Sequence, residues 1–148
     1  MKKLIIINTD GGSRGNPGPA AIGAVFSDEK GMIIKEYGEC IGQATNNEAE
    51  YQAVIFAIKK MNQLFGKKDA KNFEVEFRSD SELLVKQLNG QYKIEEPGLQ
   101  PLFLKIWNLK IELGDVKFKH IPREENKRAD RMVNEALDGG GKMQKSLI

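Results

Sequence analysis

The sequence predicts an α/β domain in which a mixed five-stranded sheet carries helices on both faces. Two observations lead to this class. The chain opens with three apolar, β-branched segments separated by short turns, a pattern typical of an antiparallel meander. Two further strand-like segments follow, separated by runs whose apolar residues recur at helical spacing. Because strands connected through helices usually run parallel, the sheet should contain both orientations.

The three opening strands are expected over residues 3–10, 20–28 and 32–42. Their sequences, KLIIINTD, AAIGAVFSD and MIIKEYGECIG, concentrate apolar side chains as buried strands do. The segment GGSRGNPGP between the first two is too rich in glycine and proline for regular structure. It predicts a turn whose backbone approaches another group closely.

Helices and strands alternate in the rest of the chain. A helix is expected over residues 46–65, where T-N-N-E fits a capping box with Thr45 as the N-cap and Glu48 as its partner. S-D-S-E fits a second capping box, with Ser79 as the cap of a short helix and Glu82 as its partner. The other expected elements are a strand over 73–80, a helix after Pro97 with Trp107 in the core, a strand over 115–121 and a last helix that begins near residue 126 and ends at a run of glycines.

Composition and length indicate one domain. The chain has 148 residues, a formal net charge of +2 and a single cysteine, Cys40, so neither an internal disulfide nor a cysteine metal cluster can form. We expect a catalytic domain over residues 1–138 and a flexible tail over residues 139–148. The sequence contains neither a membrane-spanning apolar run nor a signal peptide, which favours a cytoplasmic location.

Four carboxylates are candidates for chemistry. Asp10 and Asp80 end two predicted strands, and Asp80 is free if Ser79 caps the helix that follows. Glu50 shares a helix face with the apolar residues that should pack on the sheet, whereas the capping box accounts for Glu48. Asp130 lies on the apolar face of the last helix, although a solvated position there is an alternative. Such a cluster would suit a hard divalent cation bound through oxygen.

Four segments in order resemble the type 1 ribonuclease H family: TDGGSRGNPGPAAIG, TNNEAEYQAV, SDSELLVKQLNG and IPREENKRADRMVNEA. The resemblance covers nearly the whole chain. It implies a ribonuclease H-like fold and an endonuclease that cleaves the RNA strand of RNA/DNA hybrids with two Mg²⁺ ions, leaving 5′-phosphate and 3′-hydroxyl ends. Mn²⁺ is a possible substitute, and a monomer is expected. The family's metal ligands correspond to Asp10, Glu50, Asp80 and Asp130.

The same resemblance implies a surface that contacts the sugars and phosphates of the hybrid. The matching positions are Gly11, Gly12, Asn16, Thr45, Asn46 and Asn47. Many family members also carry a histidine in the loop before the last helix. Here His120 falls at a strand end, and the PREENK segment is typical of a subgroup without that histidine, so Arg123 and His120 are alternative candidates to assist the reaction. The family's basic protrusion is also absent, which implies weaker binding of hybrid.

Other functions remain compatible with these residues. A transposase-type or resolvase-type nuclease could use the same sheet and carboxylates. A catalytically weak module that binds hybrid or double-stranded RNA is a second alternative, disfavoured because all four carboxylates are present. A phosphate-binding enzyme built on GGSRGNPG is a third, although this run lacks the lysine and serine of a P-loop.

Overall fold

The opening meander is confirmed. Strands β1 (Lys3–Ser13), β2 (Gly18–Asp28) and β3 (Ile33–Ala44) pair in antiparallel order in the computed structural model, which describes residues 2–139 and 142–146. The segment predicted to be an irregular turn is shorter than expected, because residues 11–13 continue β1 and residues 18–19 begin β2. The register pairs Asp10 with Gly23 and Gly11 with Ile22. Since neighbouring residues of a strand point to opposite faces, Asp10 and Gly11 face opposite sides of the sheet.

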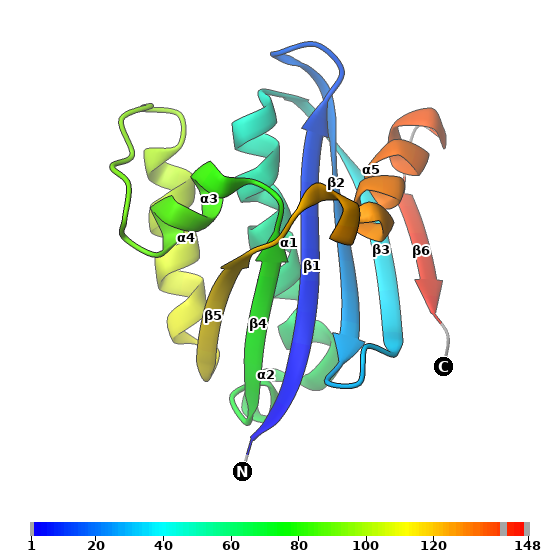
Figure 1. The fold of residues 1–148 in the computed structure, drawn as a ribbon, viewed down its shortest axis with the longest axis vertical. Coiled ribbons are helices and arrows are strands. Elements are labelled where there is room, and N and C mark those ends of the chain that lie inside the picture. The colour runs from blue at the N-terminus through cyan, green and yellow to red at the C-terminus, as the bar shows by residue number, and fades with distance from the viewer. Residues whose placement is uncertain (1, 140–141, 147–148) are drawn as a thin grey trace.

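The second half of the sheet is parallel. Strand β4 (Phe73–Ser79) runs parallel to β1, and β5 (Asp115–His120) runs parallel to β4. In the part of the chain that the structure describes, the strand order is β5-β4-β1-β2-β3-β6. Figure 1 shows the carboxyl ends of β1, β4 and β5 at the same edge of the sheet. The predicted mixed α/β fold is confirmed.

Helices cover the two faces of the sheet. Helix α1 (Asn46–Phe65) packs against β1 and β2 on one face of the sheet and contacts α4 (Gln100–Ile111). Helix α5 (Lys127–Gly139) packs against β2 and β3 on the other face, as Figure 1 shows. The main core lies between α1 and the sheet and includes Ile7, Phe26, Ile58 and Phe77. The helices are α1 (Asn46–Phe65), α2 (Lys67–Ala70), α3 (Glu82–Leu88), α4 (Gln100–Ile111) and α5 (Lys127–Gly139), with a 3₁₀ turn at Arg123–Glu125.

The C-terminal segment differs from its predicted form. Residues 139–148 were expected to be a flexible tail, but Gly139 ends α5 and β6 (Lys142–Ser146) pairs antiparallel with β3. The reason is that β3 otherwise presents unpaired backbone groups at the edge of the sheet, and any extended segment can pair with them. Residues 140, 141, 147 and 148 lie outside the described part of the chain.

Trp107 is also placed differently from its prediction as a core residue. Its side chain on α4 is 47% exposed, with Phe103 stacked beside it at a ring-centroid distance of 6.2 Å. The Lys110 ammonium lies 4.4 Å from the ring centroid of Trp107, a distance suited to a cation–π contact. Only Ile106 of this helix is fully buried, so the apolar run does not predict which face is covered. No helix among the described residues is long and apolar enough to cross a membrane.

Candidate active site

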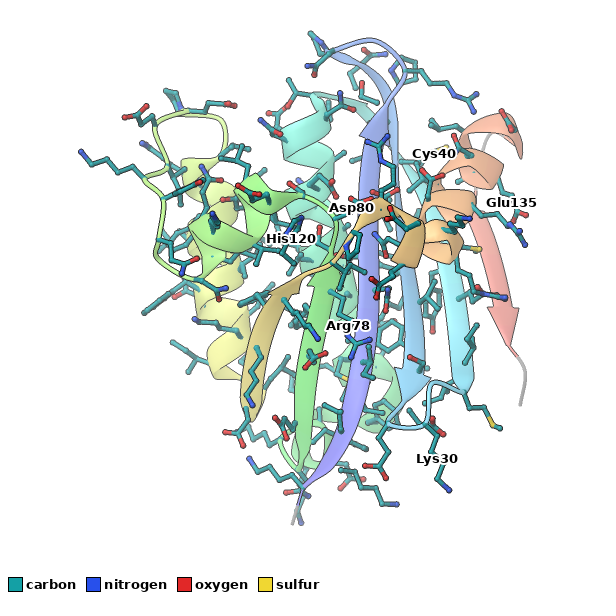
Figure 2. The ribbon with its side chains drawn as sticks, in the orientation of Figure 1. Lys30, Cys40, Arg78, Asp80, His120 and Glu135 are labelled. Atoms are coloured by element: carbon teal, nitrogen blue, oxygen red, sulfur yellow. The ribbon has the colours of Figure 1, made fainter. Side chains whose placement is uncertain are left out.

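Asp10 and Asp80 lie side by side because of the strand register. The parallel ladder between β1 and β4 ends with the pair Asn8 and Arg78, and the two aspartates each follow two residues later. A step of two residues keeps a side chain on the same face. Asp80 therefore lies next to Asp10 at the carboxyl edge, where ligands bind in open α/β sheets. Figure 2 shows Asp80 and His120 at this edge, at the ends of neighbouring strands.

Glu50 reaches this edge from α1 on the other face of the sheet. Its Oε1 accepts a hydrogen bond of 2.9 Å from the Gly11 backbone N–H. A Cβ atom on Gly11 would lie 2.3 Å from the Ala49 carbonyl oxygen, so only glycine allows α1 to approach so closely. One carboxylate oxygen each from Asp10, Glu50 and Asp80 lies within 4.8 Å of the others. The structure thus brings together three of the four predicted carboxylates.

The capping box predicted for Glu48 is present. The Thr45 Oγ1 accepts from the Glu48 N–H at 3.1 Å, and the Thr45 N–H donates to Glu48 Oε1 at 2.8 Å. Glu48 therefore stabilises the start of α1. The two glutamates of this segment serve different purposes.

The capping box predicted for Ser79 is wrong. Helix α3 starts at Glu82, and Ser81 caps it by accepting from the Leu84 N–H at 3.2 Å. The Ser79 hydroxyl accepts from the Ser81 N–H at 3.0 Å and supports the turn before the helix. Both serines of S-D-S can cap, and the sequence does not show where the helix begins. Neither arrangement uses the Asp80 side chain.

Asp130 occupies the exposed first turn of α5, beside the group of three rather than within it. It lines a cleft of about 430 Å³ at the edge of the sheet. We call this the carboxylate cleft; its lining residues are Asp10, Gly11, Gly12, Ser13, Arg14, Asn46, Glu50, Asp80, Arg123, Asp130, Val133, Asn134 and Leu137. Asp130 is therefore exposed to solvent, which was the alternative for this residue, and it also lines the cleft.

Burial and like-charge repulsion make the carboxyl groups of Asp10 and Glu50 hard to ionise. Burial, and then the charges of Asp80 and Asp130, raise the pKa of Asp10 to about 8. Burial and the charges of Asp10 and Asp80 raise the pKa of Glu50 well above its usual value. A divalent cation would offset this repulsion and is bound best by carboxylate oxygens. The donor set therefore fits hard divalent cations.

Arg123 supplies positive charge at the same edge. Burial raises the pKa of Glu50 and of Asp80, and the charge of the Arg123 guanidinium partly offsets this rise. Arg123 lines the carboxylate cleft, whereas His120 is exposed at the end of β5 and does not line it. The charge of His120 also offsets part of the rise in the pKa of Asp80.

The polar residues predicted to contact substrate divide into two groups. Asn16 and Asn46 are joined, because the Asn46 N–H donates to Asn16 Oδ1 at 3.0 Å and Asn46 Oδ1 accepts from the Ser13 N–H at 2.9 Å. Asn16 and Asn46 are both exposed, and Asn46 lines the carboxylate cleft. The Asn47 amide instead donates to Glu96 Oε1 at 3.4 Å, and Thr45 serves as a cap. Gly12 lines the cleft together with Gly11.

The sequence did not identify Asn126 as a site residue, although its buried side-chain amide lies between β1 and α5. Nor did it identify Arg14, which lines the cleft and forms an ion pair of 2.7 Å with Asp138 of α5. The only signal for Asn126 was an asparagine before a helix, which normally indicates an N-cap. Cys40 is a half-buried strand residue whose Sγ lies 3.2 Å from the Ala136 carbonyl oxygen.

Gly11→Ala should separate α1 from β1. The added methyl group would meet backbone atoms of Ala49 and Glu50 at 2.5 Å or less, and backbone cannot yield as a flexible side chain can. We expect thermal unfolding to show a loss of about 1–3 kcal/mol, the usual cost of overpacking. Gly12→Ala is the matched control, because its Cβ would meet only the Val133 side chain at 3.5 Å. Equal stability of the two variants would contradict the close approach at Gly11.

This chain is similar to several known proteins. The model of the reverse transcriptase-like family matches residues 8–136. Ribonuclease HI of Halobacterium salinarum is 44% identical over 129 residues, which cover 87% of this chain and 62% of that protein. A bifunctional protein of Mycobacterium tuberculosis is 36% identical over 90% of this chain, but the match spans only 35% of its own length.

A solved structure agrees with the fold over its full length. LC11-RNase H1, isolated from compost by a metagenomic approach and solved in complex with an RNA/DNA hybrid, is 52% identical. The superposition has a TM-score of 0.87 and covers 92% of this chain and 98% of that one. The family match over residues 8–136 includes Asp10, Glu50, Asp80 and Asp130. The chain belongs to the type 1 ribonuclease H family.

Proposed function

We propose that this protein is an endonuclease that hydrolyses the RNA strand of RNA/DNA hybrids and leaves 5′-phosphate and 3′-hydroxyl ends. The observation that carries the proposal is the convergence of Asp10, Glu50 and Asp80 at the carboxyl edge of the sheet. The support from relatives is that LC11-RNase H1 was solved with an RNA/DNA hybrid bound. The catalytic domain would comprise the sheet and its helices as far as α5.

We propose that Asp10, Glu50, Asp80 and Asp130 hold two Mg²⁺ ions, for which Mn²⁺ could substitute. When bound, such a pair would activate a water molecule and stabilise the leaving oxygen of an in-line displacement. Asp10 adjoins Glu50 and Asp80, and the charge of Asp130 also reaches it, so all four carboxylates could help to hold such ions. The Gly11 N–H fixes the Glu50 carboxylate in place before anything binds.

Other residues of this chain would bind and orient the hybrid. Asn16 and Asn46, tied to each other at the rim, offer amide groups to sugar and phosphate oxygens. Recognition of RNA requires contact with the 2′-hydroxyl, which both donates and accepts hydrogen bonds. Arg123 would face a phosphate and balance negative charge as it develops. None of these contacts requires a base edge, so cleavage should not depend on sequence.

A panel of labelled nucleic acids tests the proposal. The full chain should cut the RNA strand of a hybrid in the presence of Mg²⁺ or Mn²⁺, and chelator should abolish the cutting. Double-stranded DNA should remain intact, and the RNA products should carry 5′-phosphates. Cutting that continues in chelator, or the absence of hybrid cleavage with either metal, would refute the assignment. Cleavage of double-stranded DNA would instead favour a resolvase-type nuclease.

A further inference from the structure

We propose that Asn126 is a positioning residue that sets where Asp130 and Arg123 stand relative to Asp10. This inference rests on the proposed function, because it assigns Asn126 a part in building the same cation site. Asn126 does not line the carboxylate cleft and is only 1% exposed. Any influence on the reaction must therefore pass through the residues that it holds.

The Asn126 side chain is bonded to the end of β1. Its Nδ2 donates to the Thr9 carbonyl oxygen at 2.9 Å, and its Oδ1 accepts from the Asn8 Nδ2 at 3.1 Å. The Thr9 carbonyl belongs to the peptide unit that leads into Asp10. One buried side-chain amide therefore fixes the chain immediately before Asp10, which is itself buried.

The Asn126 backbone is bonded to both residues across the cleft from β1. Its N–H donates to the Arg123 carbonyl at 2.9 Å, and its carbonyl accepts from the Asp130 N–H at 3.1 Å. Asn126 thus joins the 3₁₀ turn that presents Arg123 to the helical turn that presents Asp130. Through its side chain, the same residue connects both turns to Asp10.

Asparagine suits this position because both polar atoms of its side-chain amide have partners. The Thr9 carbonyl requires a donor and the Asn8 amide requires an acceptor, and a carboxylate or an aliphatic side chain cannot satisfy both. An asparagine before a helix commonly caps that helix, but this side chain is committed to β1 instead. Loss of the amide would leave buried polar groups unpaired and free the turn to shift.

A second anchor holds α5 independently of Asn126. Arg128 donates two hydrogen bonds of 2.8 Å to the two carboxylate oxygens of Glu36, which is 4% exposed on β3. Such a bidentate pair is geometrically specific. Helix α5 should therefore stay docked on the sheet when the Asn126 amide is lost, and the change should be confined to the turn that carries Arg123 and Asp130.

The test compares Asn126→Ala and Asn126→Asp with the parental chain. Affinity for Mn²⁺ is measured by calorimetry without substrate, and hybrid cleavage is titrated with Mn²⁺. We expect both the dissociation constant and the concentration for half-maximal turnover to rise at least about tenfold, the usual scale for residues that orient metal ligands. The Asn126→Asp variant keeps the size of the side chain but presents an acceptor to the Thr9 carbonyl, so its affinity for Mn²⁺ should fall as well.

Val75→Ala is the matched control for stability. Val75 is fully buried in β4, near the opposite end from Asp80, and its truncation should lower the melting temperature without altering Mn²⁺ affinity. Unchanged Mn²⁺ affinity in both Asn126 variants, or an equal loss of affinity in Val75→Ala, would overturn the positioning role. The calorimetry uses no nucleic acid, so it decides the role of Asn126 even if the parental chain cleaves no hybrid, a result that would refute the proposed function alone.

Discussion

Glu50→Gln should lower hybrid cleavage by orders of magnitude without lowering the melting temperature. Glutamine keeps the size and helix propensity of glutamate and can still accept the hydrogen bond from the Gly11 N–H. What it loses is the negative charge that would bind a cation beside Asp10 and Asp80. Turnover of labelled hybrid at saturating Mg²⁺ and thermal unfolding of the same preparation measure the two effects.

Glu48→Gln is the control two positions away. Its side chain bonds the Thr45 N–H, and a glutamine oxygen can accept that bond equally well. Turnover should therefore stay close to the parental rate, and any loss of stability should remain within about 1 kcal/mol, the scale of a helix cap. An inactive Glu48→Gln together with an active Glu50→Gln would show that the roles of the two glutamates are reversed.

Asp10→Asn should abolish turnover and, without divalent cations, raise the melting temperature. Burial and the neighbouring carboxylates raise the pKa of Asp10 to about 8, so the folded state resists the charge that the unfolded chain carries freely. Asparagine removes this cost and the repulsion with Asp80 and Asp130. A gain of 1 kcal/mol would correspond to a rise of about 2–4 °C for a chain of this size.

The gain in stability from Asp10→Asn should increase as the pH rises. Near pH 4 the Asp10 carboxyl begins to ionise in the unfolded chain but stays protonated in the folded one, so the parental protein loses stability as pH rises toward 8. The advantage of Asp10→Asn should therefore be small near pH 4 and largest above pH 8. Melting curves in chelator at several pH values test this trend, with the exposed Asp69→Asn as the control. A lower melting temperature for Asp10→Asn at neutral pH would contradict the cause assigned to the shift.

The sequence predicted the features that depend on local patterns. The capping box at Thr45 follows from four consecutive residues, and β-branched runs make visible the strands near whose carboxyl ends Asp10 and Asp80 lie. Glu50 could be identified because helical periodicity assigns it to the face that packs on the sheet. These features need no knowledge of distant partners.

The features that were missed depend on what a distant segment offers. Strand β6 forms because β3 has a free edge, and Trp107 is exposed because no element among the described residues covers its side of α4. Asn126 serves β1, 117 residues away, although its position suggests only a helix cap. The cap of α3 shifted from Ser79 to Ser81 because either serine could fill it. In each case several local solutions were open, and tertiary contacts selected one.

Anomalous diffraction from crystals grown with Mn²⁺ would test the catalytic metal site, because it locates cations without relying on activity. A peak is expected in the carboxylate cleft, within coordination distance of Asp10, Glu50 and Asp80. With hybrid bound, a second peak about 4 Å away should be shared between Asp10 and Asp130. Crystals of Asp10→Asn should show neither peak. A cleft without anomalous signal in the parental protein, or Mn²⁺ bound only at other acidic side chains, would contradict the assignment of these carboxylates as the catalytic metal site.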